Sequence, residues 1–221
     1  RDAQESRGLG DVYKRQVTTG LFEFAKSMGM KVLVAGKGKN NKNIHDANPD
    51  SAREEAESKH MSPHMLAAFQ DGTKTMAEMT LLSNATGLTP DITGMHGISG
   101  DLDQTVEKLD LTADGGVLNS FGVVEYVNGI APGVFVIVEG QNEGVKNEMN
   151  YLLKKGDRKH HILYRPFHLA SLETPLTIAK AVLNHDHAIV PIGAPVSETI
   201  AVAKRDIKSG ETIDGLSLIH I

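Results

Sequence analysis

The feature that most constrains the fold is an apolar run that leads into a lysine-bearing glycine segment, KVLVAGKGKNN at residues 31–41. Val32 to Ala35 predict a short buried strand, and residues 36–41 predict a loop at its carboxyl end. In an open α/β sheet, side chains at the carboxyl ends of strands form the binding crevice. The lysines there suit an anionic ligand or proton transfer to a carbonyl oxygen, with a solvated basic loop as the alternative.

Helical and strand-like segments alternate along most of the chain. Apolar periodicity and capping residues predict helices over residues 21–28, 51–60, 72–85 and 174–183, and a further helix that starts at Ser62-Pro63. Short apolar runs predict strands over residues 123–127, 134–139 and 160–164. The fold class is therefore α/β. After Asn184 the sequence pattern changes to short β-like runs with glycine and proline, which predicts a small β-rich module.

Composition excludes several classes of function. The formal net charge is −5, and neither a basic stripe nor an aromatic platform is present, which argues against nucleic-acid binding. No apolar run approaches the roughly 18 residues of a membrane span, and we expect a cytoplasmic protein. The absence of cysteine excludes disulfides and zinc-thiolate sites. His185 and His187 lack an evident third ligand, so we expect no metal site.

Both ends of the sequence differ from the body. Residues 1–16 and residues 216–221 (LSLIHI) resemble translated sequencing-adapter tracts. We set both segments aside as artefactual tails before considering the fold.

The start of the helix at residues 72–85 is a candidate binding element. Asp71 can cap it, and Thr73, Lys74 and Thr75 place hydroxyls and an ammonium where backbone N–H groups lack helical partners. Such an end can orient a phosphate or carboxylate. The structural alternative is a routine cap with a Lys74–Glu78 surface pair.

Two further segments carry candidate chemistry. His96 lies in the glycine loop GMHGISG and could act as a general acid or base, or be a surface residue. Arg165 and His168 follow a predicted strand. Arg165 could clamp an anionic group and His168 could donate a proton. The alternative is an Arg165–Glu173 salt bridge beside a buried His168.

Several motifs taken together resemble one family. VLVAGKGKNN, DGTKTMAEMTLLSNATGLTPDITGMHG, DGGVL, APGVFVIV, LYRPFHLASLETPLTIAKAVL and AVAKRDIKSGET resemble the homoserine dehydrogenase-like NAD(P)-dependent oxidoreductases with a C-terminal SAF domain. One branch of that family is 1-deoxy-D-xylulose 5-phosphate reductoisomerase-like. The motifs do not include the spaced catalytic aspartate and lysine of true homoserine dehydrogenases, which argues against homoserine as substrate.

The resemblance implies a domain organisation. Residues 17–47 would be the end of a Rossmann-type cofactor domain, residues 48–184 an α/β substrate domain, and residues 185–215 a truncated SAF-like module. No GxGxxG occurs in the sequence. The cofactor fingerprint would therefore lie upstream, the chain would be a fragment, and its cofactor-binding residues stay unassigned.

The resemblance also implies an activity and a set of site residues. NADP or NAD would reduce a carbonyl of a small hydroxylated, anionic substrate, a sugar phosphate or sugar acid. No nucleic-acid, membrane or metal partner is implied, and a homo-oligomer is compatible with the resemblance. The alternatives are a non-redox SAF-domain protein, a sugar-acid lyase or carbohydrate-binding protein, or an inactive truncated product. The predicted catalytic residues are Lys37, Lys39, Lys74, His96 and His168, and the predicted substrate-binding residues are Asn40, Asn41, Thr73, Thr75, Glu78 and Arg165.

Overall fold

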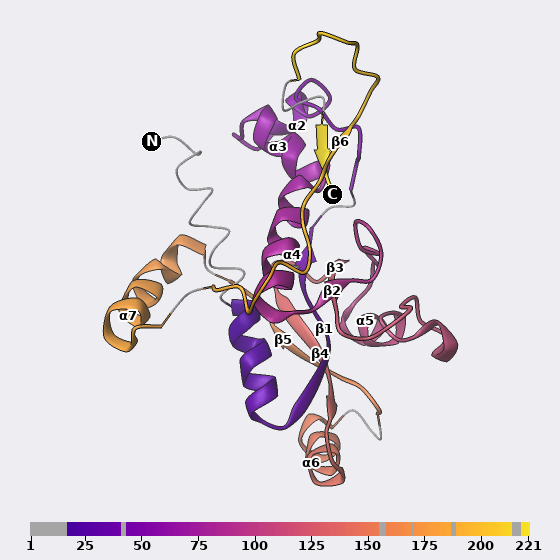
Figure 1. Ribbon diagram of the computed structural model, residues 1–221, viewed down its shortest axis with the longest axis vertical. Coiled ribbons are helices and arrows are strands. Elements are labelled where there is room, and N and C mark those ends of the chain that lie inside the picture. Colours follow the sequence, from indigo (N-terminus) through magenta and orange to yellow (C-terminus); the bar gives the residue numbers. More distant parts are fainter. Residues whose placement is uncertain (1–16, 41–42, 155–157, 169, 187–188, 214–217) are drawn as a thin grey trace.

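A five-stranded mixed sheet forms the centre of the molecule. The computed structural model describes residues 17–40, 43–154, 158–168, 170–186, 189–213 and 218–221 (Figure 1). The strand order is β2 (Thr89–Pro90), β3 (Val123–Asn128), β1 (Met30–Lys39), β4 (Val134–Gly140) and β5 (His161–Arg165). β2, β3 and β1 are parallel, whereas β4 and β5 are antiparallel to their neighbours. The predicted α/β class is confirmed.

Helices cover both faces of this sheet. A helix over residues 17–27 and α4 (Thr73–Thr86) pack on one face, where Phe22, Met76 and Leu82 meet side chains of β1, β3 and β4. α5 (Leu102–Lys108) and residues 109–121 cover the other face, where Leu109 and Phe135 are fully buried. Burial of these side chains supplies the main stabilisation of the fold. The long helix predicted at residues 72–85 is thus confirmed and lies directly on β1.

The remaining elements surround this core. α2 (Arg53–Ser58) and α3 (Pro63–Gln70) pack together near the start of α4, and α3 begins at Pro63 as the sequence predicts. α6 (Glu143–Leu153) lies at the far end of the sheet (Figure 1). Two short 3-10 turns, η1 (Thr112–Asp114) and η2 (Ala170–Glu173), complete the connections. α7 (Thr174–Asn184) projects from the body and buries none of its described side chains.

The glycine segment after the first strand is not a loop. β1 continues through Gly36 and Gly38 to Lys39, and both lysines are buried. A Cβ at Gly38 would lie 2.4 Å from the backbone of Ala131, and a Cβ at Gly36 would collide with the carbonyl oxygen of Glu125. The two glycines therefore allow neighbouring backbone to approach β1. The predicted loop was wrong because this packing function of glycine extends the strand.

The strand of the segment 17–47 shares its sheet with strands of the segment 48–184. β1 is hydrogen-bonded to β3 on one side and to β4 on the other. The boundary predicted after residue 47 therefore does not separate two sheets among the described residues. The tail predicted at residues 1–16 lies outside the described residues.

The C-terminal part forms a small second sheet. β6 (Ala201–Ala203) pairs antiparallel with β7 (Leu218–His220). Ile219 in β7 is buried, so part of the segment that we set aside as a tail contacts the rest of the chain. Across the described residues, every helix is too short or too polar to cross a membrane.

Candidate functional site

A pocket lies at the carboxyl end of β1, next to the start of α4. Its volume is about 250 Å³. The pocket brings together predicted residues from three parts of the sequence: residues 37–40, residues 74–75 and His168. The elements that line it are β1, α3, α4, the β3–β4 turn and the segment after β5. The lining residues are Lys37, Gly38, Lys39, Asn40, Phe69, Lys74, Thr75, Ala131, Pro132 and His168.

Sheet register explains why these side chains converge. Lys37 is paired with Tyr126 in β3 and with Val134 in β4, and Val134 is paired with Arg165 in β5. Paired residues in neighbouring strands point to the same face of a sheet. Lys37 and Lys39 therefore both point to the α4 face, because side chains alternate along a strand.

Lys37 is held by an ion pair inside the protein. Its Nζ contacts the carboxylate of Glu78 in α4, and the exposed fractions of the two side chains are 6% and 1%. Removing two charges from water is costly unless each stabilises the other. The pair therefore fixes α4 on β1, and it places Glu78, a predicted substrate-binding residue, below the pocket as the partner of Lys37.

Lys39 occupies a different electrostatic environment. Burial lowers the pKa of its ammonium group, and the nearby carboxylate of Asp71 opposes this shift. A lysine with a lowered pKa is a better proton donor near neutral pH than an exposed lysine. This combination of burial, pocket lining and a lowered pKa is typical of functional lysines.

The start of α4 forms one wall of the pocket. Lys74 and Thr75 line it, and the ammonium of Lys74 lies 4.9 Å from the ring centroid of Phe69. Gly72 is the N-cap, and Asp71 accepts a hydrogen bond of 2.9 Å from the backbone N–H of Thr73. The helix start and Lys74 together favour an anionic group at this wall.

The structure separates His168 and Arg165. His168 lines the pocket. Arg165 instead donates a hydrogen bond of 2.6 Å to Glu173 and lies against the ring of Phe167. This is the salt bridge that the sequence left open as the alternative. Arg165 is not among the described residues that line the pocket.

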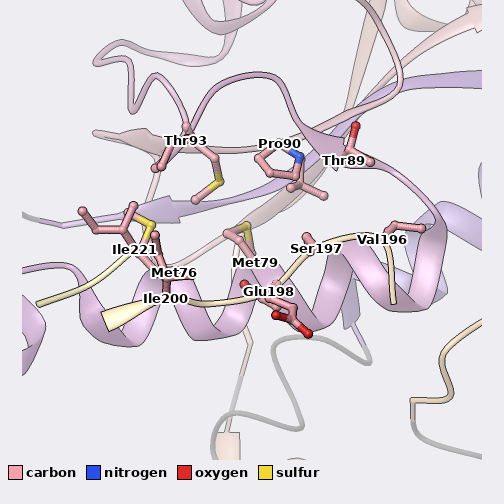
Figure 2. Close-up of a pocket in the computed structure, with 14 residues that line it drawn as sticks. Met76, Met79, Thr89, Pro90, Thr93, Val196, Ser197, Glu198, Ile200 and Ile221 are labelled. Carbon is pink, nitrogen blue, oxygen red and sulfur yellow. The ribbon is translucent and has the colours of Figure 1, made fainter. Parts of the chain in front are cut away.

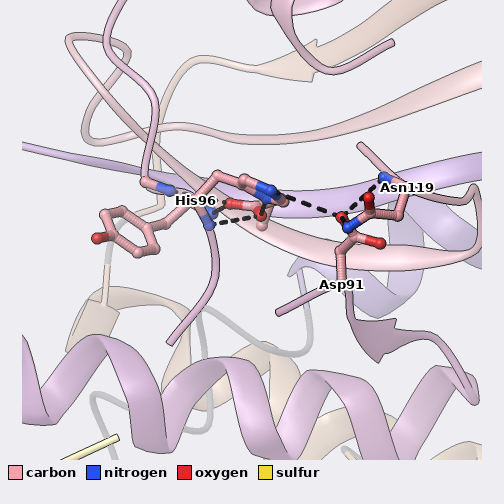
Figure 3. A network of polar contacts seen from close by, with 6 residues as sticks. Asp91, His96 and Asn119 are labelled. Carbon is pink, nitrogen blue, oxygen red and sulfur yellow. Dashed lines mark hydrogen bonds and ion pairs between the residues drawn. The ribbon is translucent and has the colours of Figure 1, made fainter. Parts of the chain in front are cut away.

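His96 belongs to a second polar cluster, at the edge of β3 (Figure 3). Its Nδ1–H donates to Glu125 Oε1 at 2.8 Å, and its Nε2 lies 3.5 Å from Asp91 Oδ2. Asp91 also accepts hydrogen bonds from the backbone and side chain of Asn119. The imidazole thus lies between two carboxylates. Among the described residues, His96 is not one of those that line the lysine pocket.

Glu125 supplies hydrogen-bond acceptors at the edge of the sheet. Its carboxylate accepts backbone N–H groups of His96, Gly97 and Tyr126 at 2.8, 3.2 and 3.3 Å. Burial raises the pKa of Glu125, while the hydrogen bonds from His96 and Gly97 oppose the shift. The carboxylate takes the place of a strand that would otherwise accept these donors. Sequence reasoning missed Glu125 because it lies within an apolar strand.

A second cavity, larger than the lysine pocket, is separate from it. It has a volume of about 350 Å³ and lies between α4, the segment 89–95 and the C-terminal segment (Figure 2). Met76 and Met79 point into it from α4, and Val196 and Ile200 close its other side. It lacks the lysines that would recognise an anion, so the lysine pocket is the better candidate for chemistry.

Several contributors to the site were not predicted, and one prediction falls outside the described residues. Ala131 and Pro132 reach the pocket through the β3–β4 turn, and Phe69 through α3. The turn is joined to β1 by the close approach of Gly38 and by a backbone hydrogen bond of 2.8 Å from Gly38 to Gly133, which no local pattern reveals. Asn40 lines the pocket as predicted, whereas Asn41 lies outside the described residues.

A family model for the catalytic domain of the oxidoreductase DRL matches residues 16–174. The chain belongs to this family. The pocket residues from Lys37 to His168 all lie inside the matched range. No curated protein matches the sequence. The expected oxidoreductase class is therefore confirmed at the level of an oxidoreductase catalytic domain. The SAF-like module predicted for residues 185–215 lies beyond the match and stays a prediction.

The residues that bind the cofactor stay unassigned in this chain. The sequence contains no GxGxxG. The two glycines at the end of β1 pack against the backbone of Glu125 and Ala131, and Gly38 also lines the lysine pocket.

Proposed function

We propose that this oxidoreductase domain binds a small anionic hydroxycarbonyl compound in the lysine pocket and supports its reduction with NADPH or NADH. The substrate class is a sugar phosphate or sugar acid, in keeping with the resemblance to homoserine dehydrogenase-like and reductoisomerase-like enzymes. The observation that carries the proposal is the convergence of Lys37, Lys39 and Lys74 on one pocket of an oxidoreductase catalytic domain. A nicotinamide supplies hydride in such reductions; its binding residues are not assigned in this chain.

The pocket offers separate groups for charge and for the proton. Lys74 and the start of α4 bind the anionic end of the substrate, because both present positive charge to the pocket. Lys39 donates a proton to the carbonyl oxygen as negative charge develops there, because its lowered pKa favours proton release. His168 lies within the same pocket and can hydrogen-bond a substrate hydroxyl.

Pocket size supports a small substrate. A cavity of about 250 Å³ is below the usual range of about 300–1,000 Å³ for drug-sized ligands. Its lysines favour phosphate or carboxylate over a neutral sugar. The match to an oxidoreductase catalytic domain supports this redox proposal over a lyase or a carbohydrate-binding role.

The proposal is tested by following nicotinamide absorbance with the intact protein, across panels of sugar phosphates and sugar acids, each with its neutral sugar as control. We expect oxidation of NADPH or NADH with an anionic compound and none with the neutral counterpart. Lys74→Gln should raise KM for the anion about tenfold, the effect of losing one charged contact of about 1.4 kcal/mol. Lys59→Gln, an exposed lysine of the α2 end, is the matched control. Absence of turnover with every compound would refute the proposal.

A further inference from the structure

The C-terminal segment lies along α4 and is attached to it at several points. Asn84 accepts backbone N–H groups of Val196 and Ser197 and donates to the carbonyl oxygen of Ser197. One turn earlier in α4, the hydroxyls of Thr80 and Thr199 are 2.7 Å apart. Figure 2 shows the segment running beside the helix, and Figure 1 shows it continuing toward the start of α4. The segment thus runs antiparallel to α4.

The segment places a largely buried lysine side chain, Lys204, near the start of α4. Lys204 Nζ donates to Asp71 Oδ2 at 2.8 Å and to the carbonyl oxygen of Ala47 at 2.8 Å. The side chains of Lys204 and Asp71 are 12% and 6% exposed. A charge-assisted pair with a second acceptor and little solvent is well ordered. Lys204 lies outside the range that matches the family model.

Asp71 is the charged residue that connects this lysine to the pocket. One carboxylate oxygen accepts from Lys204, and the other accepts from the backbone N–H of Thr73. The same carboxylate is close enough to Lys39 to stabilise its ammonium form. Asp71 is therefore paired directly with Lys204 from the C-terminal segment, and its charge also acts on Lys39 from β1.

We infer that Lys204 is a positioning residue for the lysine pocket, because it fixes Asp71 beside Lys39 and takes up part of its negative charge. The C-terminal segment is then a strap along α4 that keeps Lys39 a ready proton donor. Undocking of the strap would remove the Lys204 charge from Asp71, whose carboxylate would then attract Lys39 more strongly. The inference rests on the pocket assigned under the proposed function, but not on its turnover.

The charges around Lys39 determine the direction in which its pKa should change when Lys204 is removed. The pocket presents Lys37 from β1 together with its partner Glu78, and Lys74 from α4, while His168 approaches from the segment after β5. None of these changes when Lys204 is removed. Loss of the Lys204 charge strengthens the attraction of Asp71 for Lys39 and removes a repulsion, and both effects favour the ammonium form of Lys39.

The test is a lysine NMR titration of the intact protein. With ¹³C-labelled lysine, the side-chain resonance of Lys39 is assigned by its loss in Lys39→Arg and is followed against pH. Lys204→Met should raise the pKa of Lys39 by about half a unit or more. Lys204→Arg should leave it near the wild-type value, because the charge is kept. Asp71→Asn should lower it, and this second variant tests the same link if Lys204→Met fails to fold.

A matched control separates the link from a general charge effect. Lys208→Met removes an exposed lysine of the same C-terminal segment and should leave the titration of Lys39 unchanged. Equal midpoints in wild type, Lys204→Met and Asp71→Asn would overturn the inference. The titration needs no substrate, so an inactive protein that still shows the shift would contradict only the proposed function.

Discussion

The lysine pocket and the His96 cluster differ in what the protein does with their polar groups. In the His96 cluster, the imidazole and the Glu125 carboxylate bond to each other and to nearby backbone, and Asp91 bonds to Asn119. In the pocket, Lys39 and Lys74 line a cavity of about 250 Å³. In the sequence, each region is marked by a titratable residue beside glycines. Such a motif therefore favours function only where the fold leaves its polar groups facing a cavity.

The pocket itself contains the same contrast. Lys37 lines the cavity but is also tied to Glu78 in the core. Lys39 lines the same cavity, and burial lowers its pKa. Lys37 therefore serves mainly the fold, as His96 does, whereas Lys39 is the candidate for chemistry. Substitution of Lys37 should therefore change mainly the stability of the protein, and substitution of Lys39 should change mainly its activity.

The largest expected effect on stability is at Lys37. Lys37→Met should lower the free energy of unfolding by about 3–5 kcal/mol, because it leaves Glu78 buried without its cation. The double variant Lys37→Met/Glu78→Leu should recover most of this loss, since no buried charge remains. Urea unfolding measures both. A single variant as stable as wild type would show that Lys37 does not serve the fold.

The next effect is at Glu125, in the other region. Glu125→Gln should lower the free energy of unfolding by about 1–3 kcal/mol, because an amide nitrogen then faces backbone N–H groups that need an acceptor. The same variant should leave the KM of the pocket's substrate unchanged. A Glu125→Gln protein that is stable but loses substrate binding would break the contrast between the two regions.

The smallest effect is a pH dependence of stability at Lys39. Its folded pKa lies below its unfolded value of about 10.4, so the unfolded chain binds more protons between the two values. The stability linked to the Lys39 ammonium is therefore present above the unfolded pKa of Lys39 and is lost as pH falls through its folded pKa. Lys39→Met should gain stability over wild type most at pH 7, and the gain should shrink toward pH 10. Urea unfolding at several pH values measures it, and a gain independent of pH would contradict the assignment.

Local sequence patterns were enough to predict much of the fold. The apolar run at residues 32–35, the caps around residues 72–87 and the strands near residues 123 and 134 all lie where expected, because each is specified by neighbours in sequence. The end of β1 was mispredicted. Gly36 and Gly38 indicate a loop locally, but their place in the strand depends on backbone about 90 residues away.

The site was predictable only in part. Lys39, Lys74 and His168 were identified from residue type and position, and the structure brings them to one pocket. The contact between Asp71 and Lys204, more than 130 residues later, was not predicted, and neither was Glu125, the partner of His96, which is hidden in an apolar strand. Residue type indicates what a side chain can do, but only tertiary contacts determine whether it is already occupied.

The central claim is that Lys39, not His96, handles the proton in carbonyl reduction. The direct measurement is kcat/KM of wild type, Lys39→Met and His96→Asn with the same anionic substrate and NADPH or NADH. Lys39→Met should lose about 100-fold or more, the usual contribution of a general acid. His96→Asn, whose amide can replace Nδ1–H toward Glu125, should stay within about threefold when compared at equal folded fraction, a change of about 0.7 kcal/mol. Comparable activity of Lys39→Met and wild type, or a 100-fold loss in folded His96→Asn, would contradict the account.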